Sequence, residues 1–286
     1  MSRIPHLPPP LKWAGGKRWL VPALLPIFEP YRQMRLVEPF VGGMSVALAL
    51  NPERALLGDA IPHLVNFYQW ISKRKLFRVD FPAHTKDSFY EARAEFNSII
   101  MGGDWQTRRA AELFYFLNQT AFNGICRFNG SGAFNVPYSF RKSKRICASF
   151  AQIRETICRW DIVCSSFEGL RVRPDDFIYA DPPYDEGFNG YSRGGFTWPD
   201  HVRLVEWLAG HPGPVLASNH MTDRVIALYR DAGFFVVPVM APRRISCNGN
   251  RTPKAELLLG KNISEESVRT WVARIPTTFG AVNLSA

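Results

Sequence analysis

The sequence predicts an α/β protein with a doubly wound sheet and a separate module inserted into its middle. Short apolar runs typical of buried strands alternate with helical patterns near both ends of the chain. One such run leads into a glycine turn, a helix and a second run that ends in an acid, all within residues 35–59. The stretch from residue 70 to residue 175 instead has 17 Lys and Arg against 10 Asp and Glu. This stretch interrupts the strand–helix alternation.

The N-terminal part contains the first βαβ unit. Residues 11–20 (LKWAGGKRWL) open with a Gly-Gly turn and run towards a helix. Residues 35–41 (RLVEPFV) form a short apolar run bounded by Gly42-Gly43, which predicts a buried strand. Residues 44–50 read as the start of a helix, and residues 55–58 as a second strand ending in Asp59. Strand, glycine turn, helix and strand with an acidic end are typical of a doubly wound sheet.

The middle of the chain predicts two helices followed by a hairpin. Apolar residues follow helical spacing within 89–100 and again within 110–117. In residues 121–138 (AFNGICRFNGSGAFNVPY), Asn-Gly and Asn-Gly-Ser-Gly lie between aromatic pieces, which predicts a β-hairpin with a glycine turn. The basic cluster RKSKR follows at 141–145.

The alternation resumes in the last third of the chain. Residues 176–180 (DFIYA) predict a strand that ends in Asp-Pro-Pro-Tyr, and residues 202–208 predict a helix. A strand is expected at 214–218, ending at Asn219-His220, and a helix at 223–231. Residues 234–240 and 255–259 complete the sheet as two final strands joined by a basic loop.

Composition narrows the class of protein. The 286 residues are 46% hydrophobic and carry a net charge of +10, so a polyanion is the first partner to consider. No apolar run reaches the roughly 18 residues that would span a bilayer, and the proline-rich N-terminus lacks the apolar core of a secretory signal. The histidines and cysteines show neither His-x-x-x-His nor Cys-x-x-Cys spacing, so we expect no metal.

The most specific motif is Asp181-Pro182-Pro183-Tyr184 after an apolar strand. Two consecutive prolines stiffen a turn, because neither continues a strand ladder or a helix. The turn would lie at the carboxyl end of a strand, where ligands bind in α/β sheets. A carboxylate and a backbone carbonyl held there suit the two hydrogens of an exocyclic amine, and the ring suits stacking on a base. The alternative is a rigid loop with a surface aspartate.

Two glycine turns near the N-terminus indicate a cofactor. Glu38-Pro39-Phe40-Val41-Gly42-Gly43 precedes Asp59, an acid that could hold ribose hydroxyls. The full G-x-G-x-x-G pattern is absent, which favours a nucleoside cofactor without a pyrophosphate; the alternative is a plain strand–helix turn. Residues 12–17 (KWAGGK) place an aromatic ring and two cations together but are not a Walker A loop. Here the alternative is an anion-binding turn or a buried Trp.

These pieces, in this order, resemble the Dam-like DNA adenine-N6 methyltransferases of the α group. The resemblance covers nearly the whole chain and includes KWAGGK (12–17), VEPFVGG (37–43), GD (58–59), FYFLNQTAFNGICRFNGSGAFNVPY (114–138), YADPPY (179–184) and SNH (218–220). Several ordered blocks at plausible spacing are far more specific than any one of them.

The resemblance implies a Rossmann-like S-adenosylmethionine (AdoMet)-dependent methyltransferase sheet, with an inserted helical and β-hairpin target-recognition domain. Residues 1–72 and 162–286 would form the catalytic domain, and residues 73–161 the DNA-binding domain. It further implies AdoMet as methyl donor without a metal, double-stranded DNA as substrate, no membrane, and a cytoplasmic monomer that is bacterial or phage-encoded. The reaction would be methylation of N6 of an adenine flipped out of the helix.

Site residues carried over from the family fall into three groups. The catalytic group is Asp181, Pro182, Pro183 and Tyr184. The cofactor group is Trp13, Lys17, Glu38, Phe40, Gly42, Gly43, Asp59 and Asp181. The DNA-binding group is Lys12, Phe122, Asn123, Ile125, Arg127, Pro137 and Arg141. Phe122 would fill the space left by the extruded base, and Arg127 would read a guanine edge.

Two positions depart from the family pattern. Met44 stands where the glycine turn often has a third glycine, and Phe140 aligns with an arginine of the members that recognise GATC. The second departure puts GATC specificity in doubt. Alternatives are methylation of cytosine N4, of RNA adenine or of a glutamine, although those N4 and glutamine enzymes tend to have Ser or Asn at position 181. Another is a non-catalytic DNA-binding regulator, and a restriction nuclease is disfavoured for want of an acidic metal cluster.

Overall fold

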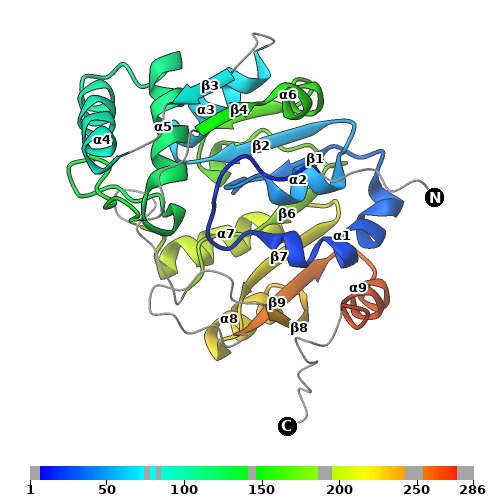
Figure 1. Cartoon of the computed structure of the whole chain (residues 1–286). Helices are drawn as coiled ribbons and strands as arrows, with labels where there is room; N and C mark the ends of the chain where they lie inside the picture. The colour runs from blue at the N-terminus through cyan, green and yellow to red at the C-terminus, as the bar shows by residue number, and fades with distance from the viewer. Residues whose placement is uncertain are drawn as a thin grey trace.

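The computed structural model describes residues 7–73, 78–81, 85–140, 146–185, 195–241 and 254–275. Within them, a seven-stranded sheet has the order β5-β2-β1-β6-β7-β9-β8 (Figure 1). Its strands are β1 (Leu36–Glu38), β2 (Ala55–Asp59), β5 (Asp161–Cys164), β6 (Phe177–Ala180), β7 (Val215–His220), β8 (Phe235–Ala241) and β9 (Lys254–Lys261). The five strands from β5 to β7 are parallel, and β9 is antiparallel to both β7 and β8.

The centre of the sheet is apolar on both faces. Leu36 of β1 joins one hydrophobic core and Val37 the other, as expected for a strand whose side chains alternate between two covered faces. The chain winds from β1 to β2 in one direction and from β6 to β7 in the other. The direction therefore reverses between β1 and β6, and the crevice beyond the carboxyl ends of these strands is where ligands bind in such sheets.

Helices cover both faces of the sheet. Leu24 of α1 (Val21–Phe28) and Phe67 of α3 (Pro62–Ser72) belong to the first core, together with Val268 of α9 (Glu265–Val272). Leu204 of α7 (Trp198–Ala209) and Val225 of α8 (Asp223–Asp231) belong to the second. Helices α1 and α9, from opposite ends of the chain, lie close together on the right of Figure 1.

The middle of the chain adds a unit outside the main sheet, at the upper left of Figure 1. It contains α4 (Lys86–Met101), α5 (Arg108–Thr120) and a two-stranded sheet of β3 (Arg78–Phe81) and β4 (Ile146–Ser149), followed by α6 (Ala151–Ile157). The side chains of Thr85 and Thr107 accept hydrogen bonds at the starts of α4 and α5. Helix α5 packs on α3, where the rings of Phe67 and Tyr115 stack with centroids 5.7 Å apart.

The predicted β-hairpin at 121–138 forms only in part, with antiparallel pairing but no regular ladder. The segment pairs only through two isolated bridges, Ala121 with Tyr138 and Phe128 with Phe134. Between them lies a short 3₁₀ helix, η3 (Phe122–Gly124), in which Asn123 has a left-handed φ of 54°. The chain still doubles back on itself, as the glycine pattern predicted, but without continuous strand pairing.

Helix α4 covers the outer edge of this segment. The side chain of Asn97 accepts a hydrogen bond from the Phe134 N–H at 2.8 Å and donates to the Phe134 carbonyl at 3.1 Å. Arg93 donates to the Val136 carbonyl at 3.2 Å. These side chains satisfy backbone groups on the outer edge, whereas the bonds between the two halves of the segment involve Ala133, Asn135 and Pro137.

The remaining predicted strands and helices of the main sheet have their counterparts in the structure. The features that were not predicted are strand β5, the β3–β4 pair and helices α3, α6 and α9. The basic cluster at 141–145, including Arg141, lies outside the described residues.

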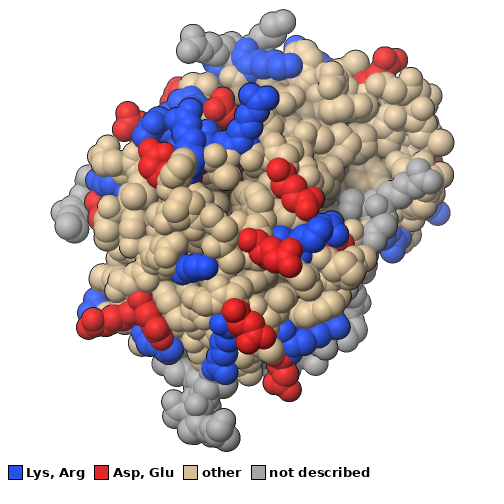
Figure 2. Space-filling model, turned by 180° about the vertical axis from the view of Figure 1, so that it is seen from behind, with Lys and Arg blue, Asp and Glu red and all other residues tan. Residues whose placement is uncertain are grey.

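The molecular surface carries basic and acidic groups together on the face turned away from the viewer of Figure 1. Lys and Arg side chains gather towards the top of that face, with Asp and Glu side chains among and below them (Figure 2). Of the helices in the described ranges, none has the length and apolar composition needed to cross a bilayer.

Candidate active site at the carboxyl edge of the sheet

Five neighbouring strands bring polar side chains to one edge of the sheet. Glu38 and Asp59 end β1 and β2, and Asp181 directly follows β6. His220 ends β7 and lies opposite Glu256 near the start of β9, which is antiparallel. Because parallel strands share a carboxyl edge, residues up to 218 positions apart meet there.

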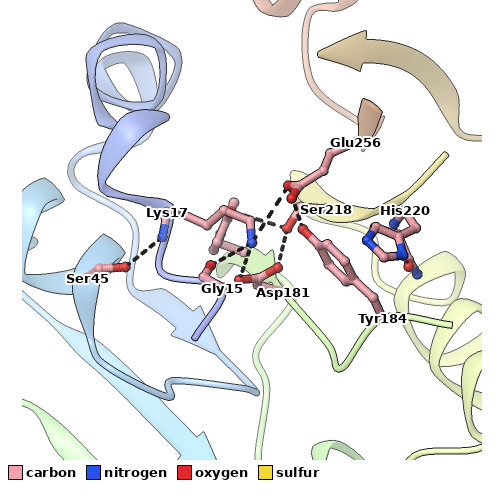
Figure 3. Close-up of polar contacts among 10 residues, drawn as sticks. Gly15, Lys17, Ser45, Asp181, Tyr184, Ser218, His220 and Glu256 are labelled. Carbon is pink, nitrogen blue, oxygen red and sulfur yellow. Dashed lines mark hydrogen bonds and ion pairs between the residues drawn. The ribbon is translucent and has the colours of Figure 1, made fainter. Parts of the chain in front are cut away.

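Asp181 is held from two sides. Lys17 Nζ donates to Asp181 Oδ2 at 2.9 Å, and Ser218 Oγ donates to Oδ1 at 2.7 Å (Figure 3). The hydroxyl of Tyr179, on β6, lies 3.4 Å from Ser218 Oγ. The Asp181 side chain remains 22% exposed. The carboxylate therefore has a fixed direction and is still open to a ligand.

Lys17 is buried at the centre of this site. Its ammonium also donates to the Gly15 carbonyl at 2.8 Å, and its backbone N–H donates to Ser45 Oγ at 3.1 Å. Burial alone would lower the pKa of Lys17, but the carboxylates of Asp181 and Glu256 outweigh it and raise that pKa. Lys17 is therefore a permanent cation that orients Asp181.

Tyr184 follows the two prolines and lies between three groups. Its hydroxyl donates to Glu256 Oε2 at 2.7 Å. The Lys17 ammonium lies 4.8 Å from the ring centroid, and the ring of His220 lies 4.6 Å away, centroid to centroid (Figure 3). Burial, with the charges of Asp181 and Glu256, raises the pKa of Tyr184 well above its ordinary value, so the hydroxyl keeps its proton.

The Gly42-Gly43 turn is shaped by Trp13. A Cβ at Gly42, whose φ is +44°, would lie 2.7 Å from Trp13 Nε1, and one at Gly43 would lie 2.8 Å from Trp13 Cβ. The glycines are thus required by the Trp13 side chain packed on the turn, and their predicted role in the approach of a cofactor stays a prediction. Tyr68 fixes the turn by donating to the Gly42 carbonyl at 3.1 Å.

Asp59 is a buried carboxylate tied to the same turn. It accepts hydrogen bonds of 3.0 Å from the N–H groups of Gly42 and Ile61. Burial outweighs these bonds and raises the pKa of Asp59 to about 6. The end of strand β5 joins it, since the Ser165 N–H donates to the Asp59 carbonyl at 3.1 Å. Sequence reasoning missed this segment because it missed β5.

Two further predicted residues line the same region. Glu38 is 3% exposed, and its Oε1 has no hydrogen-bond partner among the described residues. Burial, reinforced by the charge of Asp181, raises the pKa of Glu38 well above its ordinary value. The ring of Phe40 contacts those of Phe167 and Phe196, with centroids 6.0 and 5.6 Å apart.

Met44 occupies the position of the family's third glycine. It has a left-handed φ of 60°, is fully buried, and directly precedes helix α2 (Ser45–Leu50). The turn thus adopts a conformation that glycine would favour, with a packed side chain in its place.

The predicted DNA-binding residues gather around the end of α5. The backbone of Lys12 pairs with the side chain of Asn118, through an N–H donated to Oδ1 at 2.9 Å and a carbonyl that accepts from Nδ2 at 2.8 Å. A Cβ at Gly124 would lie 2.4 Å from Lys12 Cβ, so η3 packs directly on this segment. Phe122 is 45% exposed and its N–H donates to the carbonyl of Pro137, which is also exposed.

The other residues predicted to contact DNA lie in different environments. Arg127 Nε donates to Asn135 Oδ1 at 2.8 Å, so the guanidinium has a partner within the protein. Asn123 adopts the left-handed turn of η3, and Ile125 packs partly against the core. Arg141 lies outside the described residues.

Sequence reasoning missed Ser218 and Glu256. Ser218 lies in the SNH block, which was recognised without a role. Glu256 lies in the run AELLL of the predicted strand 255–259, where a carboxylate among apolar residues was a signal of function. In the described ranges, no group of three or more His, Cys, Asp or Glu side chains could hold a metal ion.

The family model and the relatives that match this chain all describe adenine-specific DNA methyltransferases. The family model of the D12 class N6 adenine-specific DNA methyltransferases matches residues 13–241. The chain is 36% identical to a DNA adenine methylase of Vibrio cholerae serotype O1, over 87% of this chain and 94% of that protein. It is 31% identical to the Retron Ec67 DNA adenine methylase of Escherichia coli, over 93% and 94%. It is also 34% identical to the DNA adenine methylase of Escherichia coli strain K12, over 87% and 93%.

The match covers most of the chain and includes every strand of the main sheet except β9. It confirms the resemblance drawn from the ordered sequence blocks, and the sheet agrees with the Rossmann-like fold that the resemblance implied. The chain belongs to the D12 class of N6 adenine-specific DNA methyltransferases.

Proposed function

We propose that this chain transfers a methyl group from AdoMet to N6 of an adenine in double-stranded DNA, and that Asp181, Pro182 and Tyr184 grip the extruded base. The observation that carries this proposal is the geometry of Asp181. Lys17 and Ser218 fix its carboxylate beside the ring of Tyr184, at the carboxyl edge where the sheet reverses direction.

The residues around this edge fit AdoMet. Glu38 has a buried carboxylate oxygen with no partner in the part of the chain that the structure describes, and this oxygen suits an ammonium group. The Asp59 carboxylate suits ribose hydroxyls, and the Trp13 indole packed on Gly42 and Gly43 offers an apolar wall. The Asp181 carboxylate remains 22% exposed and offers negative charge that complements a sulfonium. AdoMet supplies a methyl carbon made electrophilic by its sulfonium.

The chain's own residues prepare the acceptor. The lone pair of adenine N6 is delocalised into the ring, so it is a weak nucleophile. Asp181 and the Pro182 carbonyl accept its two hydrogens, which directs the lone pair and stabilises positive charge that develops on N6. Tyr184 stacks on the base and offsets part of the few kcal/mol that extrusion costs.

The middle of the chain, residues 73–161, would supply the DNA contacts, with residues 1–72 and 162–286 forming the catalytic domain. Lys and Arg on phosphates give affinity that is independent of sequence and sensitive to salt. Phe122 would enter the space left by the adenine, and Lys12, Asn123, Ile125, Arg127, Pro137 and Arg141 would contact the duplex. We further propose that the protein acts as a monomer in the cytoplasm.

The decisive experiment uses unmethylated double-stranded DNA and AdoMet labelled in its methyl group, with mass spectrometry of the digested nucleosides. We expect N6-methyladenine from the native chain. Asp181→Ala should abolish transfer while DNA binding changes by less than about tenfold, or 1.4 kcal/mol. Asp175→Ala is the matched control, because Asp175 is exposed before β6, at the opposite end of that strand.

Three results would contradict the proposal. They are N4-methylcytosine in place of N6-methyladenine, labelling of RNA in preference to DNA, and turnover retained by Asp181→Ala. The first two would change the substrate, and the third would remove Asp181 from the chemistry.

A further inference from the structure

Glu256 is a carboxylate in an apolar strand. The three residues that follow it on β9, Leu257, Leu258 and Leu259, are fully buried, whereas the Glu256 side chain is 14% exposed. Burial raises the pKa of Glu256, although the charge of Lys17 and the hydroxyl of Tyr184 oppose that rise. Placing an acid here costs stability, so its contacts should have a function beyond packing.

The contacts of Glu256 converge on the base-gripping corner. Its Oε2 accepts the hydrogen bond from the Tyr184 hydroxyl at 2.7 Å and lies 3.9 Å from Lys17 Nζ (Figure 3). Glu256 is paired in register with His220, whose ring lies beside that of Tyr184. Strand β9 therefore delivers one charged group to the far end of the Tyr184 side chain.

The hydrogen bond to Glu256 restrains the side-chain torsions of Tyr184, which the two prolines leave free. Pro182 and Pro183 restrict the backbone before Tyr184 but leave its two side-chain torsions free. A charge-assisted hydrogen bond at the hydroxyl restrains the ring at the end opposite to its backbone attachment. The same bond draws electron density towards the ring, which strengthens its attraction for positive charge above its face.

We propose that Glu256 is a positioning residue for methyl transfer, whose carboxylate sets the orientation of the Tyr184 ring through the phenol hydroxyl. This inference rests on the proposed role of Tyr184 as the ring on which the target adenine stacks. Glu256 does not touch the reacting atoms. Its effect on the reaction therefore passes through the Tyr184 hydroxyl.

The test is a double-mutant cycle between Glu256→Ala and Tyr184→Phe, with labelled AdoMet and unmethylated genomic DNA as probes. Each single variant should lower kcat about tenfold, with KM for DNA and the Kd for AdoMet changed less than about threefold. The double variant should be no slower than either single one, because both remove the same bond. Glu256→Gln, whose amide oxygen still accepts from the hydroxyl, should restore kcat to within about threefold of the native value.

A control variant and the activity of the native chain distinguish failure of the Glu256 proposal from failure of the proposed function. Glu265→Gln removes a half-exposed carboxylate on α9, away from the site, and should leave kcat unchanged. If the native chain makes no N6-methyladenine on DNA, the proposed function fails. If the native chain is active and Glu256→Ala keeps its kcat, or if the two single effects add, only the role of Glu256 is overturned. Should Glu256→Ala not fold, Tyr184→Phe combined with Glu256→Gln completes the cycle, and a rate below that of Tyr184→Phe alone overturns the proposal.

Discussion

Lys17 and Asp181 form a partly buried ion pair, 2.9 Å from nitrogen to oxygen, although 164 positions separate them in the sequence. The pair joins the N-terminal glycine turn to the Asp-Pro-Pro-Tyr corner. It thereby connects the two segments that we assign to cofactor and base. An ion pair at this junction fixes the distance between the two ligands that must react.

Replacement of Lys17 should separate catalysis from stability. In Lys17→Met, Asp181 and Glu256 face each other without a counter-charge, and we expect activity to fall at least about 100-fold. Breaking a fully buried pair costs about 3–5 kcal/mol, but Asp181 is 22% exposed and solvent screens its charge, so the loss of stability should be smaller. Methyl-transfer rates and denaturant unfolding check both effects.

Lys73→Met serves as the control, because Lys73 is exposed. Near-native turnover in Lys17→Met would contradict the role given to the ion pair.

The pH dependence of cofactor affinity should reveal Asp59. Its pKa is raised to about 6 by burial, so the carboxylate that would accept ribose hydroxyls becomes protonated below that pH. AdoMet affinity should be constant above about pH 7 and weaken towards tenfold per unit below about pH 6, as expected for one blocking proton. Calorimetric titrations across this range check the prediction. Burial also raises the pKa of nearby Tyr68, Cys126 and Cys164, so these groups do not titrate there.

The variant Asp59→Asn assigns that proton. It should bind AdoMet more weakly at every pH and lose the inflection near 6. Any slope that remains in the variant belongs to other buried carboxylates of the site, such as Glu38 and Glu256, whose pKa values are also raised by burial. An identical inflection in the native chain and the variant would exclude Asp59 as its source.

Site residues could be predicted where they are close together in the sequence. Asp181 and Tyr184 belong to one four-residue motif, and Gly42 and Gly43 form one turn, so the local sequence identified them. Glu256 acts through its register opposite His220 on β7. No local pattern contains that register, because it depends on which strand β9 pairs with.

The same distinction explains the errors in the fold. The apolar runs predicted the central strands because burial on both faces leaves a strong local signal. The hairpin prediction relied on glycine turns, which do fold the chain back. The ladder is incomplete because residues 122–124 form the 3₁₀ helix η3, in which Asn123 has a left-handed φ of 54°, and Asn97 and Arg93 of α4 bind only the outer edge of the returning half.

Phe122 should act in extrusion of the base and not in the fold. Its ring is 45% exposed, so Phe122→Ala should leave the melting temperature within about 2 °C of the native value, as is usual for exposed positions. We expect kcat to fall about tenfold or more while DNA binding changes little, because filling the vacated space offsets part of the cost of flipping. Stopped-flow fluorescence of 2-aminopurine at the target position measures the flipping step. An unchanged flipping equilibrium would remove Phe122 from this role.

Arg127 and Asn135 should affect sequence preference together. Asn135 Oδ1 accepts from Arg127 Nε and so directs the rest of the guanidinium. Arg127→Ala should reduce discrimination between sites by about 1–3 kcal/mol, the contribution of one bidentate base contact, and Asn135→Ala should reduce it less. Modified-base sequencing of DNA from cells expressing each variant gives the preferences. Arg108→Ala, on the exposed side of α5, is the control, and unchanged preferences would show that Arg127 only braces the loop.

Met44 offers a test of the strained turn that departs from the family pattern. Its left-handed φ of 60° costs about 1–2 kcal/mol for a residue other than glycine, whereas emptying a buried Met site costs about 2–5 kcal/mol. Both Met44→Ala and Met44→Gly should therefore be less stable than the native chain. Glycine relieves the strain and alanine does not, so Met44→Gly should be at least as stable as Met44→Ala, the reverse of their usual order in a helix. Denaturant unfolding of the native chain and the two variants gives the order of stability. A Met44→Ala variant clearly more stable than Met44→Gly would contradict the left-handed turn.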